Sequence, residues 1–407
     1  MSSSGLAKLV TAKSPAPTQR FTGLPKYNFV GGHNAPEGIP VPELTAAANS
    51  VLQREGHLLA LYNLSHGPLG YQPLREFVAG KLAGRGISCT SDDILITSGS
   101  TQGLNLVFSL FLEQGSTIVV EEFTYSSVLN RLRNQEVETI GAPLTEHGID
   151  IARLEELLEA QHKKDRPVRM VYTIPTIQNP TGTIMPMESR ERLVALARQY
   201  NFVIFEDECY ADLIWAADGV PSSIYSMAPD VTVHIGSFSK TLGPALRVGY
   251  AIAEWPILSR ILALKNDAGS GAIDQMVVAE YFSHHFSNHL ERLTGILDEK
   301  LKVMSEAIDA AFGSGVSYHV PPGGIFLWLK FPDHVDVRKL TAPALAAGVA
   351  FNPGPEWSAN GEAARSWMRL CFALPSKEII AEGIRKLSEI CYAETGFPEV
   401  SGNRVRS

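Results

Sequence analysis

The segment HIGSFSKTLGPALRVGY, residues 234–250, contains a single lysine among hydroxyl side chains, with an arginine seven positions after the lysine. A lysine amine can attack a carbonyl carbon, and hydroxyls beside an arginine suit a phosphate. The residues concerned are Ser237, Ser239, Lys240, Thr241 and Arg247. Surface loops of similar composition are common, so this segment by itself leaves its chemistry open.

Asp207 is a second residue with chemical potential, because it ends the apolar run FVIFED. An unpaired carboxylate in such a place would be costly to desolvate, so a cationic partner is expected nearby. A protonated pyridine nitrogen is one such partner, and an arginine or lysine of the core is the other. Taken alone, Asp207 favours the core cation.

Two further segments place polar residues after apolar runs. SGSTQGLNLV, residues 98–107, sets Ser100 and Thr101 at a strand-to-helix turn, where free backbone N–H groups and the helix dipole favour a phosphate. It has neither the spacing of a nucleotide P-loop nor that of a dinucleotide-binding turn. QNPTG, residues 178–182, is a tight turn whose Asn179 is explained equally well by turn chemistry.

The elements that must position these residues alternate between strand-like and helix-like segments. Strands are predicted over 93–100, 116–123, 169–175, 201–208, 231–238 and 247–254, and amphipathic stretches such as 187–200 lie between most of them. This alternation predicts an α/β fold with a mainly parallel sheet between helices, in which ligands bind beyond the carboxyl ends of the strands. The polar residues above, with Tyr125, follow those ends.

From about residue 285 the pattern predicts a second, smaller α+β unit. It contains a long helical stretch, strands within 323–331 and 367–373, and a closing helix near 376–393. The chain of 407 residues is long enough for two cores. The Gly- and Pro-rich segment 23–42 lacks periodicity and is expected to run along the surface.

Composition excludes several classes of protein. A net charge of −8 without a dense Lys/Arg block argues against nucleic acid as a partner, and no apolar run is long enough to cross a membrane. The four cysteines lie far apart, which indicates reduced thiols in a cytoplasmic protein rather than a zinc site. His285 and His289 have helical spacing but no evident third metal ligand, so we expect them on an exposed helix face. The acid-free first 36 residues favour a flexible arm over an organelle transit peptide.

Taken together, the motifs resemble fold-type I pyridoxal 5'-phosphate (PLP) enzymes of the class I/II aminotransferase family, over about residues 28–393. SFSKTLGPALRVGY resembles the family's S-x-S-K-x-x-x-P-G-x-R-x-G-Y block, QNPTG its N-P-x-G turn and DECYADL its D-[ED]-x-Y-x-x-[LF] element. The resemblance implies a large PLP-binding domain over 61–285 and a small domain over 286–407. Residues 28–60 would contribute to the small domain, and 1–27 would form an arm.

The same resemblance implies a role for each matching residue. Lys240 would form the aldimine with PLP and then act as the base, and Asp207 would keep the pyridine nitrogen protonated. Asn179 and Tyr210 would hydrogen-bond the ring's O3' oxygen, and Tyr125 would stack on the ring. Arg369 would bind the substrate α-carboxylate. The phosphate would be bound by Ser100, Thr101, Ser237, Ser239 and Arg247.

Within the family, the segments FVGGHNAPEGIPVPEL and GYQPLREFVA most resemble the subgroup of 2-aminoadipate and kynurenine aminotransferases. In that subgroup a Gly-Gly loop, here Gly31 and Gly32, lies over the substrate. A tyrosine, for which Tyr62 is the candidate, reaches the phosphate of the neighbouring subunit, which implies a homodimer with shared sites. The chain departs from the subgroup in segment 62–71, which carries His66, in Thr101, and in His33 and Asn34. His66 fits a solvated loop histidine somewhat better than a catalytic one.

Three functions remain open from the sequence. An aminotransferase would move an amino group between an L-amino acid and a 2-oxo acid. Alternatively, the same site would support a PLP-dependent lyase, decarboxylase, β/γ-replacement enzyme or oxidase. A non-catalytic sensor domain of a transcriptional regulator is disfavoured, because only about 30 residues precede the matching region and the charge is acidic.

Overall fold

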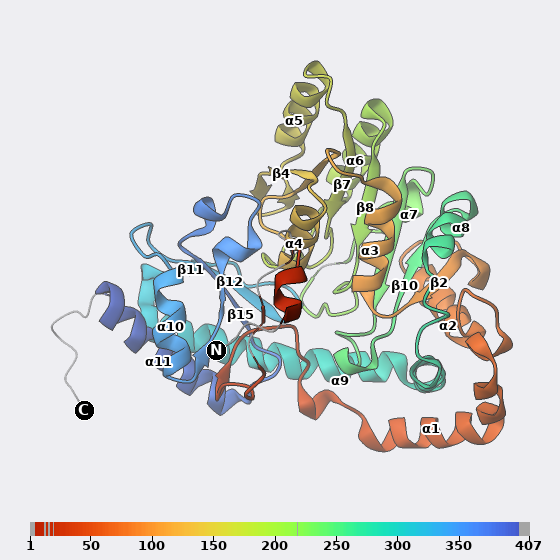
Figure 1. The fold of residues 1–407 in the computed structure, drawn as a ribbon. Coiled ribbons are helices and arrows are strands. Elements are labelled where there is room, and N and C mark those ends of the chain that lie inside the picture. The colour runs from red at the N-terminus through yellow and green to blue at the C-terminus, as the bar shows by residue number, and fades with distance from the viewer. Residues whose placement is uncertain (1–4, 12–13, 15–16, 19, 218, 399–407) are drawn as a thin grey trace.

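The computed structural model describes residues 5–11, 14, 17–18, 20–217 and 219–398 (Figure 1). Part of the arm predicted over 1–27 therefore lies outside the described residues. Among the helices that the structure describes, none combines the length and the apolar character needed to span a membrane.

A seven-stranded sheet, in the order β2-β10-β9-β8-β7-β3-β4, forms the centre of the larger part of the chain. Every neighbouring pair from β9 to β4 is parallel, whereas β10 is antiparallel to both of its neighbours. The predicted mainly parallel sheet is confirmed, and β4 is the strand that the sequence reading missed. The strands are β2 (Ile94–Thr97), β3 (Thr117–Glu121), β4 (Glu138–Ala142), β7 (Val168–Thr173), β8 (Val203–Asp207), β9 (Thr232–Ser237) and β10 (Gly249–Ile252).

Helices cover both faces of this sheet because successive residues of each strand point to opposite faces. In β2, Ile94 and Ile96 belong to one buried cluster and Leu95 to another. The first cluster includes residues of α2 (Gln72–Ala83) and the start of α9, and the second includes residues of α3, α4 and α8. The helices around the sheet are α3 (Ser100–Phe111), α4 (Ser126–Asn134), α5 (Ile151–Lys163), α6 (Met187–Tyr200), α7 (Ile224–Met227) and α8 (Trp255–Leu264).

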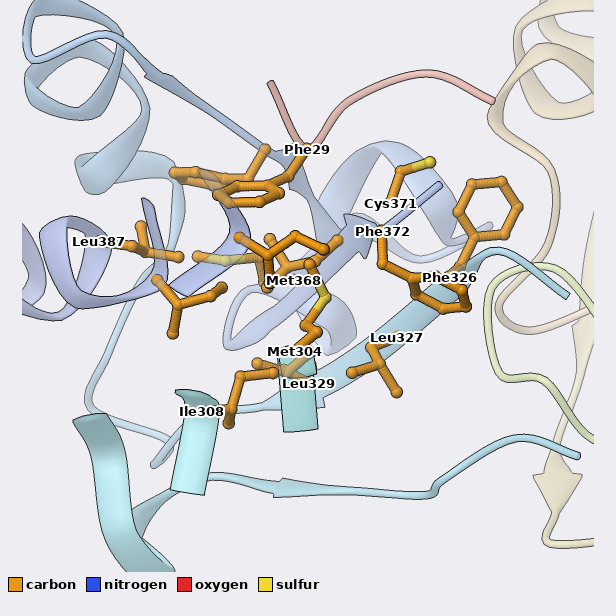
Figure 2. Packing of buried hydrophobic residues seen from close by; sticks show 14 of the residues in the cluster. Phe29, Met304, Ile308, Phe326, Leu327, Leu329, Met368, Cys371, Phe372 and Leu387 are labelled. Carbon is orange, nitrogen blue, oxygen red and sulfur yellow. The ribbon is translucent and has the colours of Figure 1, made fainter. Parts of the chain in front are cut away.

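The 41-residue helix α9 (Ala272–Phe312) links the large sheet to a smaller one (Figure 1). The small sheet has the order β11-β12-β15-β14, with β11 (Ser317–Tyr318), β12 (Phe326–Lys330), β15 (Trp367–Cys371) and β14 (Asn352–Pro353). It packs with α11 (Lys377–Thr395) and α10 (Arg338–Ala346) around a cluster that includes Leu329, Met304 and Leu387 (Figure 2).

The N-terminal segment differs from its prediction. Instead of following the surface, β1 (Tyr27–Asn28) pairs in parallel with β13 (Val349–Ala350), and the Phe29 side chain is fully buried in the small-sheet cluster (Figure 2). Because of its Gly and Pro residues the segment has no regular hydrophobic period, but the side chains of Tyr27 and Phe29 are buried in the small-sheet cluster. Farther on, α1 (Val41–Glu55) packs along α9, with Val51 in a cluster of the large sheet. The domain boundaries at 27, 60 and 285 stay a prediction.

Candidate active site

A cavity of about 280 Å³ lies where the carboxyl ends of β7, β8 and β9 meet the small sheet. It brings together every site residue predicted from the sequence except Tyr62. These are Gly32, Ser100, Thr101, Tyr125, Asn179, Asp207, Tyr210, Ser237, Ser239, Lys240, Arg247 and Arg369. Parallel strands deliver their following residues to one edge of the sheet, which explains how segments so distant in sequence converge.

Lys240 follows β9 and points toward the N-terminal loop. Its Nζ donates a hydrogen bond of 2.7 Å to the backbone carbonyl of Gly32. Burial lowers the pKa of the Lys240 amine, and the positive charges of Arg369 and Arg247 act in the same direction. A lysine with a lowered pKa has a larger neutral fraction, which is the nucleophilic and basic form.

Asp207 is the last residue of β8, and only 4% of its surface is exposed. Its Oδ2 accepts a hydrogen bond of 2.7 Å from the Tyr172 hydroxyl, and its Oδ1 accepts one of 3.2 Å from the Cys209 amide. Burial raises the pKa of Asp207, although these hydrogen bonds oppose the shift. Among the residues that the structure describes, no cationic side chain forms an ion pair with Asp207, so the expected core cation is not its partner.

Hydrogen-bond donors gather at the N-terminus of α3 and after β9. Gly99 precedes α3 with φ of 74°, and no side chain caps the helix. Arg247 donates to Ser239 Oγ at 3.3 Å, and the Ser239 amide donates to Ser237 Oγ at 3.1 Å. A Cβ at Gly99 would lie 2.3 Å from Arg247 Nη2, and the positive φ of this residue disfavours any other side chain, so the position favours glycine. This arrangement is a cradle for an anion.

The guanidinium of Arg369, in β15, is held by two aromatic rings and by hydrogen bonds. Its guanidinium carbon lies 3.6 Å from the ring centre of Trp357 and 3.8 Å from that of Phe326, so two aromatic rings flank it. Nη1 donates to Asn179 Oδ1 at 3.0 Å, while Nη2 donates to the Gly31 carbonyl at 2.8 Å and to Asn352 Oδ1 at 2.7 Å. In the described part of the chain, Arg369 Nε has no partner. Burial lowers the pKa of Arg369 to about 10, so it is charged at neutral pH.

Glu121, at the end of β3, holds the turn that carries Asn179 through hydrogen bonds. Glu121 accepts hydrogen bonds from Gln178 Nε2 at 2.8 Å, Thr173 Oγ at 2.7 Å and the Ile174 amide at 3.1 Å. Burial nevertheless raises the pKa of Glu121 to about 7. On the opposite wall, burial raises the pKa of Tyr210 well above its ordinary value, so its phenol is protonated.

Tyr62 is the predicted site residue that lies outside the cavity, with 84% of its surface exposed. It begins the short helix η4 (Tyr62–Ser65), in which Asn63, Leu64 and Ser65 all have positive φ. Left-handed backbone at three successive non-glycine residues is costly, and the buried Leu64 side chain anchors the turn. Tyr62, at the start of this turn, therefore lies on the surface and not in the cavity of its own chain.

The sequence did not predict two residues that line the cavity, Trp357 and Asn352, or Tyr172, which binds Asp207. Trp357 and Asn352, which contact Arg369, lie in segments without regular periodicity, and Tyr172 has the pattern of an ordinary strand residue. The one available signal was NPGPEW, an aromatic residue after a Gly/Pro turn and ahead of the Arg369 strand.

The expectation of an exposed helix face at both His285 and His289 is wrong for His289. His285 is exposed, but His289 is only 3% exposed and points into the protein. Within the described residues, no group of His, Cys, Asp and Glu is arranged to bind a metal. The four cysteines, all at described positions, are free.

Comparison with known proteins agrees with this geometry. The family model for aminotransferases of class I and II matches residues 32–387. A 2-aminoadipate transaminase of Thermus thermophilus is 35% identical over 88% of this chain and 88% of its own. An aromatic-amino-acid aminotransferase of Thermococcus litoralis is 32% identical over 89% of this chain and 87% of its own. The crystal structure of the α-aminoadipate aminotransferase LysN of Thermus thermophilus, complexed with N-(5'-phosphopyridoxyl)-L-leucine, superimposes with a TM-score of 0.83 at 34% identity, covering 91% of this chain and 93% of the other.

Proposed function

The chain belongs to the class I and II aminotransferase family, and on this basis we propose that its cavity moves an amino group between an L-amino acid and a 2-oxo acid with PLP as cofactor. One observation carries the proposal. Lys240, Asp207 and Arg369 face a single cavity, which combines an amine of lowered pKa, a buried carboxylate that no described cationic side chain pairs, and a guanidinium held by several partners.

The residues present fit PLP at each of its functional groups. The anion cradle at Ser100, Ser239 and Arg247 matches a phosphate. Asp207 lacks an ion-pair partner within the described chain and would be satisfied by a protonated pyridine nitrogen. The Lys240 amine matches an aldehyde.

When bound, PLP supplies an electron-withdrawing ring next to the Cα of an attached amino acid. Lys240 would bind the cofactor through its amine and, once released by the substrate, move a proton at Cα through Nζ. The lowered pKa of Lys240 favours this role, because the neutral amine accepts the proton. The Gly32 carbonyl orients Nζ toward the cavity.

The other side chains bind and orient. Asp207, held by Tyr172, would keep a proton on the ring nitrogen, and Tyr125 would cover one ring face. Asn179 and the protonated phenol of Tyr210 would bind the ring hydroxyl oxygen. Serine hydroxyls, Thr101 and Arg247 would bind the phosphate.

Arg369 would bind the substrate α-carboxylate. Its hydrogen-bond partners fix the plane of the guanidinium. The names of the relatives suggest 2-aminoadipate and aromatic amino acids as the first amino donors to test.

Tyr62 supports a homodimer in which each subunit completes the other's site. It is exposed at the start of a strained turn, next to the exposed side chains of Leu59 and Leu61. An exposed apolar strip around a tyrosine that has no role in its own cavity is best explained by a second copy of the chain.

Spectroscopy and single-turnover chemistry test the proposal. Wild-type protein mixed with PLP should develop a visible absorbance that Lys240→Ala lacks. An amino acid supplied alone should yield about one equivalent of 2-oxo acid per site and then stop until a 2-oxo acid is added. Sustained release of ammonia or CO2 from the amino acid alone would contradict transamination.

A further inference from the structure

His289 lies on α9 behind the Lys240 segment, outside the cavity itself. Its Nε2 lies 2.5 Å from the backbone carbonyl oxygen of Thr241, the residue that follows Lys240. Its Nδ1 lies 2.9 Å from the hydroxyl of Tyr281, two helical turns earlier on α9. Both ring nitrogens of this buried histidine are therefore engaged.

The partners determine the protonation of the ring. A carbonyl only accepts hydrogen bonds, so Nε2 carries a hydrogen and donates to Thr241. In the neutral ring Nδ1 is then an acceptor, and the Tyr281 hydroxyl donates to it. Burial lowers the pKa of His289, which favours this neutral form. The two hydrogen bonds therefore run in one direction, from Tyr281 to His289 and from His289 to Thr241.

The contact reaches the segment that bears the lysine. Phe238 and Leu242 flank the lysine and pack in the same cluster as Phe282 of α9. The Phe238 carbonyl accepts from the Leu242 amide at 2.9 Å, which closes a turn around Lys240. Within the described residues, the Thr241 hydroxyl has no partner, so its carbonyl is the polar group that fixes this peptide to α9.

His289 also occupies a distinctive position along α9. Buried residues before it, such as Met276 and Phe282, belong to a cluster of the large sheet, and those after it, such as Leu293 and Leu297, belong to the small-sheet cluster. The helix therefore meets the lysine segment where it passes from one core to the other.

We propose that His289, oriented by Tyr281, is a positioning residue that holds the peptide after Lys240 and so sets the lysine amine in register with the cofactor and the substrate Cα. This inference rests on the proposed function of Lys240. It assigns no direct contact between His289 and the substrate.

Four variants separate positioning from simple packing. His289→Leu removes the donor and leaves the Thr241 carbonyl unpaired, whereas a glutamine at 289 can still donate to it through Nε2. Tyr281→Phe keeps the aromatic packing and removes only the hydroxyl. His284→Gln, at an exposed position on the same helix, is the control.

The readouts are kcat and KM at saturating PLP, and the rate at which Lys240 is reductively methylated in cofactor-free protein, followed by mass spectrometry. His289→Leu should lower kcat about tenfold to a hundredfold with KM nearly unchanged, because misplacement of a reacting group chiefly affects turnover. It should also change the methylation rate of Lys240. His289→Gln should recover most of kcat, Tyr281→Phe should be intermediate, and His284→Gln should match the wild type.

Wild-type kcat and methylation in His289→Leu, with only a lower melting temperature, would overturn the proposal. If His289→Leu does not fold, Tyr281→Phe decides, and wild-type behaviour there would refute the role. If the wild type binds no PLP, the proposed function fails, while the methylation rates still test whether His289 positions Lys240.

Discussion

Lys240 and Gly32 are 208 residues apart in sequence, yet the lysine Nζ hydrogen-bonds the Gly32 carbonyl at 2.7 Å. The Lys240 amine also lies close to the Gly32 Cα, since a Cβ at Gly32 would lie 2.4 Å from Nζ. Gly31, the preceding residue, accepts from Arg369. Two successive carbonyls of one loop thus contact the two side chains that we assign to catalysis and to carboxylate binding.

Gly32→Ala should therefore damage catalysis more than stability. The added methyl must displace the flexible end of Lys240, which costs little folding free energy, but the amine loses its orientation. We expect kcat/KM to fall about tenfold or more while the melting temperature changes by only a few degrees.

Gly80→Ala, which adds a methyl in open space on α2, is the control and should leave kcat/KM unchanged. Equal kinetics for the two variants would contradict the prediction.

The sequence predicted six of the seven strands of the large sheet, all but β4, and the cavity residues that follow those strands. Hydrophobic period and composition predict β8 and β9. Because these strands are parallel, the residues at and after their carboxyl ends, Asp207 and Lys240, lie at the same edge of the sheet. The motifs that identify the family lie at these same strand ends, which is why the strand pattern and the family resemblance predict the same site residues.

What the sequence did not give depends on contacts between distant segments. The burial of Phe29 follows from pairing with β13, and the stacking of Trp357 on Arg369 joins a loop to a strand of the small sheet. The prediction for His289 was wrong because i, i+4 spacing predicts a shared helix face, whereas the Lys240 segment covers His289 through the Thr241 carbonyl and leaves His285 exposed. No local pattern contains that information.

Stability should depend on pH through Glu121. Its pKa of about 7 in the folded protein exceeds the ordinary 4.5, so the folded state binds more protons between these values. The free energy of unfolding should fall as pH rises through this interval, by about 3 kcal/mol in total. Glu121→Gln cannot ionise and should remove this part of the slope. Urea unfolding of cofactor-free protein at pH 5 and 7.5 measures it.

Glu113→Gln, at an exposed site, provides the control for that experiment and should keep the wild-type slope. A slope that is identical in Glu121→Gln and the wild type would show that Glu121 is ionised in the folded state throughout.

Arg369→Lys should lose substrate affinity although it keeps the positive charge. An ammonium lacks the planar fork that Asn179 and Asn352 hold, and it stacks less well between Trp357 and Phe326. We expect kcat/KM for the amino acid to fall about a hundredfold or more, mainly through KM, with PLP absorbance unchanged. Arg365→Lys, an exposed arginine nearby in sequence, should show no such loss. A normal KM in Arg369→Lys would place the carboxylate elsewhere.

Tyr62 allows a test of whether two chains share each site. Tyr62→Phe should weaken PLP binding about tenfold, the cost of one hydrogen bond to a charged group, and so lower activity at limiting PLP. Lys240→Ala should be inactive.

If Tyr62 acts on the partner, a heterodimer of Tyr62→Phe and Lys240→Ala contains one site with both residues intact and one with neither. Co-expression with two affinity tags and purification through both yields this heterodimer. At limiting PLP it should show about half of the wild-type activity per dimer, because its single competent site is fully restored. If Tyr62 acts within its own chain, the site bearing Lys240 keeps the Tyr62→Phe defect, and the heterodimer should show only half of the activity of the Tyr62→Phe dimer.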